Sequence, residues 1–218
     1  MNIGNLTKEE IIKRHNFRCI HSHTGLEHQN CYDEHFQIKK KRAFLDIETS
    51  NLHADFGYLF SYVLLGEDGK RYERILTSDE IRKHIFDKNL IMQFCKDISN
   101  YERIFVYWGK SGRHDLPFLL TRALVWGEEI PNTIYVTDIY DVIKMKLRLH
   151  RNRLENACQL FNIPAKEHRL DPNTWQKAMS GDARSLNYIL LHNREDCESL
   201  KNLWHKIERY TKLTKTSI

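Results

Sequence analysis

Residues 43–49 read Ala43-Phe44-Leu45-Asp46-Ile47-Glu48-Thr49. This pattern predicts a hydrophobic β-strand, and because successive side chains of a strand point to opposite faces, Asp46 and Glu48 share one face. Neighbouring carboxylates repel each other and resist ionising together, so a bound cation is the usual reason for such a pair. The segment therefore predicts a divalent-metal site, with two ordinary acids at a solvated strand edge as the alternative.

The size and composition of the chain predict a folded protein. Its 218 residues suffice for one substantial domain with a small appendage. Hydrophobic residues make up 41% and charged residues 29%, a balance typical of soluble globular proteins. No apolar run approaches the length of a membrane span, and the first residues lack the pattern of a secretory signal. These features predict a cytoplasmic protein outside the membrane.

The charge balance favours an anionic partner. Lys and Arg total 34 against 29 Asp and Glu, which gives a net charge of +5. If several acids hold metal ions, the remaining surface is more positive than this total suggests, so nucleic acid is an expected partner. The five cysteines are an odd number in a chain without a secretory signal, which argues against a disulfide framework.

The order of hydrophobic patterns predicts an α/β fold. A hairpin over residues 58–76 follows the first strand, and two helices separated near Asp87 follow the hairpin. The expected elements after these are a strand over 103–108, a helix over 115–126, a strand over 134–137, and helices from 154 onwards, the last running from 183 to about 210. An antiparallel meander at the start of an α/β order predicts a mixed sheet.

Two later acids occur in comparable settings. Asp115 follows a strand at the start of a helix, and Asp196 lies inside the last helix, four residues after His192. This spacing puts His192 and Asp196 on one helix face. Taken singly, each acid is better explained without a site: Asp115 as an ordinary helix cap, and Asp196 as one of several helix-surface acids.

Together, the acids resemble the DEDD 3′–5′ exonucleases of the ribonuclease H-like superfamily, above all YprB-like nucleases and the proofreading domains of family-B DNA polymerases. The three motifs are Asp46-Ile47-Glu48-Thr49, Asp115 with Leu116-Pro117-Phe118-Leu119, and His192-Asn193-Arg194-Glu195-Asp196. The resemblance covers about residues 42–208. It implies a ribonuclease H-like mixed β-sheet flanked by α-helices over residues 37–218, preceded by a small His/Cys-rich extension over residues 1–36.

The resemblance also implies a reaction. Asp46, Glu48, Asp115 and Asp196 would hold two Mg²⁺ or Mn²⁺ ions that hydrolyse a terminal phosphodiester. The expected substrate is the 3′ end of single-stranded DNA, with RNA not excluded. The alternatives are a catalytically weak nucleic-acid-binding module of a replication or repair assembly, and an endonuclease of the same superfamily.

The chain departs from the family at two positions. Tyrosine-type members have Tyr three intervening residues before the last Asp, and histidine-type members have His with four; here His192 has the tyrosine spacing. An imidazole suits general-base work, so His192 is a candidate to orient or deprotonate the attacking water. His114 stands before Asp115 where Phe is common in the relatives.

Residues near the second motif are candidates to contact the nucleic acid by stacking or phosphate pairing. They are Tyr107, Trp108, Lys110, Arg113 and His114. The densest basic stretch comprises Lys144, Lys146, Arg148, His150, Arg151 and Arg153. It is a candidate phosphate track or, equally, a solvated surface, and Tyr107 and Trp108 could instead be core residues.

Histidine and cysteine are concentrated near the N-terminus. Cys19, His21, His23, His28 and Cys31 lie within 13 residues, where chance predicts about one. Both residue types are zinc ligands, and a segment with little core of its own gains stability from a structural metal. The spacing matches no standard zinc finger, and five candidates exceed the four ligands required. A structural zinc site is therefore one expectation, and a polar extension packed across the sheet is the other.

Overall fold

The computed structural model describes residues 6–36, 41–164 and 166–211. The chain divides into two compact units, Met1–Lys40 and Lys41–Ile218. The domain boundary expected after residue 36 adjoins residues 37–40, which lie outside the described residues. No helix in the described part of the chain is long and apolar enough to cross a membrane.

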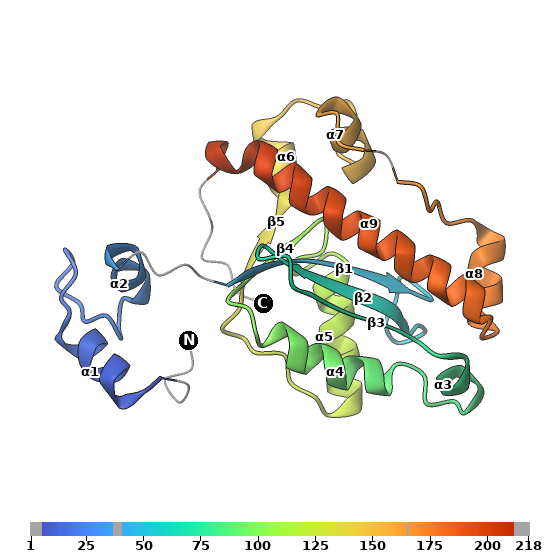
Figure 1. The fold of residues 1–218 in the computed structure, drawn as a ribbon, viewed down its shortest axis with the longest axis horizontal. Coiled ribbons are helices and arrows are strands. Elements are labelled where there is room, and N and C mark those ends of the chain that lie inside the picture. Colours follow the sequence, from blue (N-terminus) through green and yellow to red (C-terminus); the bar gives the residue numbers. More distant parts are fainter. Residues whose placement is uncertain (1–5, 37–40, 165, 212–218) are drawn as a thin grey trace. The chain divides into compact units, whose positions relative to one another are not determined.

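The larger unit is built on a five-stranded mixed sheet. Its strands are β1 (Arg42–Thr49), β2 (Leu59–Gly66), β3 (Arg71–Ile75), β4 (Arg103–Val106) and β5 (Tyr135–Asp138), in the order β3-β2-β1-β4-β5. The three strands β1, β2 and β3 pair antiparallel, and β4 and β5 continue the sheet in parallel with β1 (Figure 1). The predicted mixed sheet with an antiparallel meander is confirmed.

Helices cover both faces of this sheet (Figure 1). One face carries α4 (Lys88–Ile98) and α5 (Asp115–Trp126), and the other carries α6 (Ile139–Lys146), α7 (Leu154–Leu160) and α9 (Ala183–Ile207). Along β1, Leu45 and Ile47 pack with α4 and α5, whereas Phe44 packs with α9. Strand alternation therefore turns Asp46 and Glu48 towards α9.

Local capping chemistry sets the helix starts. Thr77 forms a capping box with Glu80 at α3 (Ser78–Arg82), Asp171 caps α8 (Pro172–Met179), and Asp182 caps α9. At the C-terminal end of α5, the C-cap residue Gly127 takes the left-handed conformation with φ of 72°. The last helix ends slightly earlier than expected, because residues after Ile207 form a 3₁₀ turn, Glu208–Tyr210.

One predicted strand is longer than the observed one. The strand expected over residues 103–108 ends at Val106, so Tyr107 and Trp108 lie beyond it. Trp108 has a positive φ of 60°, and its N–H donates to the Asp138 carboxylate rather than to a neighbouring strand. A side-chain acceptor from another part of the chain thus terminates the strand.

The smaller unit contains two short helices, α1 (Lys8–Asn16) and α2 (Gln29–His35). A buried ion pair of 3.0 Å joins Arg14 of α1 to Asp33 of α2. The Phe17 ring packs edge-on against Tyr32 with centroids 5.2 Å apart. These contacts hold the two helices together around a very small core.

Candidate active site

Strand β1 and helix α9 bring the first and third motifs together. His192 and Asp196 share one face of α9, and the His192 Nε2 atom lies 3.1 Å from Asp196 Oδ2. The same nitrogen lies 3.5 Å from Glu48 Oε1 on β1. Asn193 donates from Nδ2 to Asp46 Oδ2 at 3.0 Å. The two motifs therefore form one group of side chains.

Contacts along α9 fix this helix against the sheet. The buried Cys197 thiol donates to the backbone carbonyl oxygens of Phe44 on β1 (3.6 Å) and Val63 on β2 (3.3 Å). Arg194 donates from Nε to Glu73 on β3 at 2.8 Å. Because three strands hold one helix, the position of His192 along β1 is set by the fold.

Asp115 reaches the site from the start of α5. The N-cap of this helix is His114, whose side chain makes no capping hydrogen bond, and Asp115 is the first helical residue. Its side chain is buried, and its Oδ2 atom has no hydrogen-bond partner among the described residues. A Cβ atom built on Gly109 would lie 2.4 Å from that oxygen, so only glycine allows this approach. The interpretation of Asp115 as an ordinary cap is wrong.

The carboxylates influence one another strongly. Loss of water contact raises the pKa of Asp46 well above its usual value, and the charges of Asp196, Glu48 and Asp115 raise it further. Burial, together with Asp138 and Glu48, raises the pKa of Asp115 in the same direction. The site therefore concentrates more negative charge than its buried surroundings favour.

Two cations offset part of this charge. Burial raises the pKa of Glu48 to about 7 with the help of Asp196, against the opposing charges of His192 and Lys166. Lys166 forms an ion pair with Asp196. Burial alone would raise the pKa of Asp196, but the hydrogen bond from His192 and the charge of Lys166 outweigh it and lower that pKa. The net pKa shift of His192 is upwards, because Asp196 and Glu48 outweigh its burial.

The orientation of the His192 ring is fixed through its other nitrogen. Nδ1 donates to the backbone carbonyl oxygen of His168. His168 is itself held by Glu195, which accepts from the His168 backbone N–H at 3.1 Å and lies 2.6 Å from its Nδ1. A carbonyl oxygen only accepts hydrogen bonds, so the Nδ1 atom of His192 carries a proton and Nε2 faces the acids.

Asp138 holds the loop that leads to Asp115. Its carboxylate accepts hydrogen bonds from the backbone N–H groups of Trp108 (2.9 Å), Gly109 (3.1 Å) and Lys110 (3.2 Å). Arg113 donates to the same carboxylate at 2.6 Å. These contacts position Gly109 beside the Asp115 carboxylate.

Sequence reasoning did not identify Asp138, Asn193 or Lys166 as site residues. Asp138 shares with Asp115 the signal of an acid between a strand and a helix, which could have pointed to it. Asn193 lies inside the third motif, but its side chain is uncharged and was not considered as a metal ligand. Lys166 lies in a segment without helical or strand periodicity, so no pattern indicates where it points.

The aromatic candidates near the second motif have different surroundings. Trp108 is 49% exposed, whereas Tyr107 is half-buried and its hydroxyl donates to the Asn152 carbonyl oxygen at 2.9 Å. His114 Nε2 lies 3.3 Å from the Thr49 hydroxyl at the end of β1. Trp108 thus presents a ring to solvent, while the other two are engaged within the fold.

The basic candidates also differ in their contacts. Lys110 and Arg113 both form ion pairs with Asp141, so part of their charge is already offset. The six basic residues of the dense stretch are all exposed; they are Lys144, Lys146, Arg148, His150, Arg151 and Arg153. This stretch begins in the last turn of α6 and continues through the loop to α7, with all six side chains exposed to solvent.

A cavity of about 830 Å³ opens beside the acids. Its lining combines apolar side chains, including Leu154, Ile163 and Leu170, with Lys166 and His192. The cavity is thus formed by α7, the segment before α8, and α9, and among the described residues it reaches the acids only through Lys166 and His192, which contact Asp196.

In the smaller unit, the structure brings four of the five zinc candidates together. The ligand atoms of Cys19, His21, His28 and Cys31 all lie within 4.8 Å of one another. His23 is outside this group, although its ring packs against His28.

Comparisons with known proteins agree with this architecture. A family model described as the RNase_H superfamily matches residues 43–208. The solved structure of the family B DNA polymerase from the hyperthermophilic archaeon Pyrobaculum calidifontis is similar, with a TM-score of 0.64 and 15% identity. The alignment covers 79% of this chain and 25% of that chain, so the present chain spans about a quarter of the polymerase. At this identity the likeness concerns the fold. No curated protein matches the chain.

Proposed function

Because the chain belongs to the RNase H superfamily, we propose that it is a metal-dependent 3′–5′ exonuclease acting on single-stranded nucleic acid. One observation carries the proposal: β1, α5 and α9 gather four carboxylates, and burial together with neighbouring negative charges raises the pKa of three of them, Asp46, Glu48 and Asp115. Concentrated negative charge is costly in a buried site unless cations compensate it. A domain that only binds nucleic acid has no chemical need for such a cluster.

The donor set fits magnesium or manganese. Hard cations prefer oxygen ligands, and the Asp115 Oδ2 atom is buried without a partner among the described residues. Asp46, Glu48, Asp115 and Asp196 would hold the ions. Ions bound there would supply a water of lowered pKa as nucleophile and positive charge for the leaving 3′ oxygen.

His192 is suited to take the proton from that water. Asp196 and Glu48 raise the pKa of His192, so metal ions that offset their charges would favour the neutral ring. In that form the Nδ1 proton is committed to the His168 carbonyl, and the Nε2 lone pair is available on the side of Glu48 and Asp196. The Glu195 carboxylate supports this arrangement by holding His168. A general base must be both oriented and near the acids that bind the reacting group, and His192 meets both requirements.

The cavity beside the acids supports a single-stranded substrate. The partly exposed Leu154 and Leu170 offer apolar surface to bases, and Lys166, which pairs with Asp196, would exchange that partner for a phosphate. The exposed basic stretch over residues 144–153 leads to α7, which lines the same cavity. A single-stranded nucleic acid bound in this cavity would have its 3′ end near Asp196 and Glu48.

The activity can be tested on the full chain with labelled single-stranded DNA and RNA in Mg²⁺ or Mn²⁺. We expect stepwise shortening from the 3′ end that a chelator abolishes. Asp46→Asn removes one ligand charge and should lower the rate on the order of 100-fold or more. Asp79→Asn is the matched control, because Asp79 is an exposed acid on α3 and should leave the rate unchanged.

The alternatives give different products. Cleavage of a circular single strand would identify an endonuclease, and salt-dependent binding without hydrolysis would identify a binding module. Equal shortening by the wild type and by Asp46→Asn would exclude these acids as the source of the activity.

A further inference from the structure

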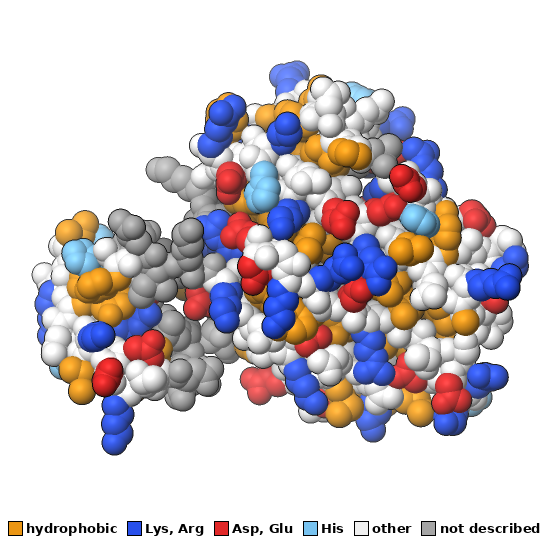
Figure 2. Space-filling view, viewed as in Figure 1, with side chains coloured by type: hydrophobic (Ala, Val, Ile, Leu, Met, Phe, Trp, Pro, Cys, Tyr) orange, Lys and Arg blue, Asp and Glu red, His pale blue; other side chains and the backbone are white. Residues whose placement is uncertain are grey.

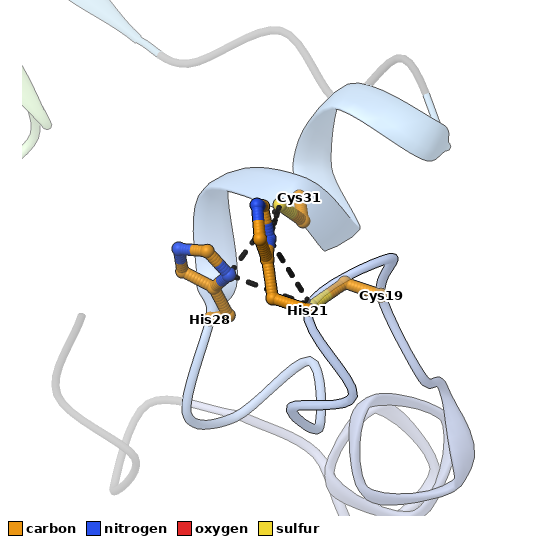
Figure 3. A group of neighbouring side chains, drawn as sticks. All are labelled: Cys19, His21, His28 and Cys31. Atoms are coloured by element: carbon orange, nitrogen blue, oxygen red, sulfur yellow. Dashed lines mark hydrogen bonds between the residues drawn. The ribbon is translucent and has the colours of Figure 1, made fainter.

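The described part of the smaller unit contains an arrangement that the nuclease proposal does not use. Cys19 and His21 lie on the loop that precedes α2, His28 lies immediately before α2, and Cys31 lies in its first turn (Figure 3). The four side chains converge, and the two cysteines are not joined in a disulfide.

The distances between these ligand atoms are those of a tetrahedral metal site. Cys19 Sγ lies 3.4 Å from His28 Nδ1 and 3.8 Å from His21 Nδ1. Cys31 Sγ lies 3.5 Å from His28 Nδ1 and 3.7 Å from His21 Nδ1. A Zn–S bond of about 2.3 Å and a Zn–N bond of about 2.0 Å at the tetrahedral angle separate sulfur from nitrogen by about 3.5 Å. The observed separations bracket this value.

The backbone explains why these residues converge and His23 does not. The Cys19 N–H donates to the His23 carbonyl oxygen at 3.0 Å, and the Ser22 N–H donates to the Cys19 carbonyl oxygen at 2.8 Å. Ser22 has a positive φ of 66°, so the chain reverses sharply here. The turn presents Cys19 and His21 together, whereas the backbone of His23 closes the turn.

A second local motif positions the other two ligands. The Thr24 hydroxyl and the Glu27 carboxylate exchange hydrogen bonds with each other's backbone N–H groups, at 3.2 and 2.8 Å. The His28 N–H then donates to the Thr24 carbonyl oxygen at 2.8 Å. His28 and Cys31 are three residues apart at the start of a helix, which puts them on one face.

We propose that Cys19, His21, His28 and Cys31 bind one zinc ion that stabilises the smaller unit. Thiolate and imidazole are borderline-soft donors, which favour zinc over magnesium or calcium. Four protein ligands complete a tetrahedral site and leave no open position, so the ion is structural. The two His ligands bind through Nδ1, the nitrogen that faces both thiols.

The small core of this unit gives the metal a role. Among the described residues of the unit, the buried hydrophobic side chains are Cys19 and Tyr32. Folded units of about 40 residues usually need a disulfide, a metal or a partner to be stable. Since Cys19 is itself a ligand, the ion would join the Cys19–His23 turn to α2 where apolar packing is sparse.

The test is metal analysis of the full chain prepared without chelators. We expect one zinc ion per chain in the wild type, and loss of that ion in Cys31→Ser and His28→Ala. His23→Ala is the matched control and should retain zinc, because its side chain lies outside the group. Asp46→Asn should also retain zinc, which separates this site from the acidic cluster. Zinc that persists in Cys31→Ser, or is lost from Asp46→Asn, would overturn the assignment.

A second measurement does not depend on the folding of a variant. Wild-type protein loaded with Co²⁺ should show the intense visible bands of tetrahedral cobalt and a thiolate-to-cobalt charge-transfer band, both displaced by stoichiometric Zn²⁺. Weak octahedral bands without charge transfer would mean that cobalt binds carboxylates and that the four residues do not form a metal site.

Discussion

Gly109 is the residue on which the position of Asp115 depends. A methyl group at this position would meet Asp115 Oδ2 at 2.4 Å and the Val106 Cβ atom at 2.9 Å. We expect Gly109→Ala to push the Asp115 carboxylate away and to lower the rate of 3′ shortening on the order of 100-fold, because small misplacements of catalytic groups cost that much. The rate on single-stranded DNA, measured beside urea unfolding, checks this.

Gly112, in the same loop, provides the matched control. It has a positive φ of 79° and open space around its Cβ position. Gly112→Ala should therefore cost about 1 kcal/mol of stability through backbone strain and leave the rate almost unchanged. If Gly109→Ala and Gly112→Ala were equally active, the close contact at Asp115 would have no bearing on catalysis.

Some residues of the candidate site could be predicted from the sequence, and others could not. Strand alternation predicted that Asp46 and Glu48 share a face, and helical spacing predicted the same for His192 and Asp196; the structure shows both arrangements. Lys166 was not predicted, because it reaches Asp196 from a segment without periodicity. In a helix or strand, the spacing along the sequence indicates which side chains point the same way. In an irregular segment, the direction of a side chain depends on tertiary packing.

At the scale of elements, Asp87 joins β2, α4 and α5. Its fully buried carboxylate accepts from the Leu59 N–H (2.8 Å), from Arg122 (2.6 and 2.8 Å) and from Trp126 Nε1 (2.9 Å). Asp87→Ala leaves the Arg122 charge and the two other donors without this partner, so the free energy of unfolding should fall by about 3–5 kcal/mol. Urea denaturation followed by circular dichroism measures this loss.

An exposed ion pair on the neighbouring helix gives the comparison. Asp79 on α3 and the C-cap residue Lys83 form a 2.8 Å pair at i,i+4 spacing, with both side chains about 60% exposed. Lys83→Ala should cost less than about 0.5 kcal/mol, since exposed pairs are well solvated. A similar cost for both variants would mean that Asp87 is not a structural anchor.

The elements that could be predicted are those with local causes. Thr77, Asp171 and Asp182 start helices through hydrogen bonds to backbone groups two or three residues away, and the sequence displays such caps directly. The end of β4 was predicted two residues too late. Its cause is Asp138, which accepts from the Trp108 N–H across 30 residues of sequence. A residue so far away in the sequence cannot be recognised from the local pattern around β4.

At the scale of the whole molecule, the net charge of +5 is the small excess of 34 basic over 29 acidic side chains. Basic and acidic side chains are interspersed on the face of the larger unit in Figure 2. Against this mixed background, we propose the exposed basic residues over 144–153, the densest basic stretch of the sequence, as a localised site of attraction for phosphate.

This distribution predicts where phosphate binding is concentrated. Changing Lys146, Arg148 and Arg151 together to Gln should weaken binding of single-stranded DNA and reduce its salt dependence by about 0.7 in log–log slope for each lost phosphate contact. Fluorescence anisotropy across a salt series, without divalent metal, measures both quantities on uncut substrate.

The control removes the same charge elsewhere in this unit. Arg82 at the end of α3, its C-cap residue Lys83, and Lys96 on α4 are exposed, and α4 lies on the sheet face opposite α9 (Figure 1). Their joint change to Gln should leave the slope unchanged. An equal loss from both triple variants would assign the attraction to overall charge and not to the 144–153 stretch.

The contact between Asn193 and Asp46 spans 147 residues of sequence. A ribosome adding about 5–20 residues per second needs roughly 7–30 s to pass from one to the other. During that interval β1 exists without the helix that supplies His192 and Asp196. A nascent chain therefore has no assembled acidic site while most of the sheet is already synthesised, and translation itself delays the appearance of any chemistry until α9 has emerged and docked.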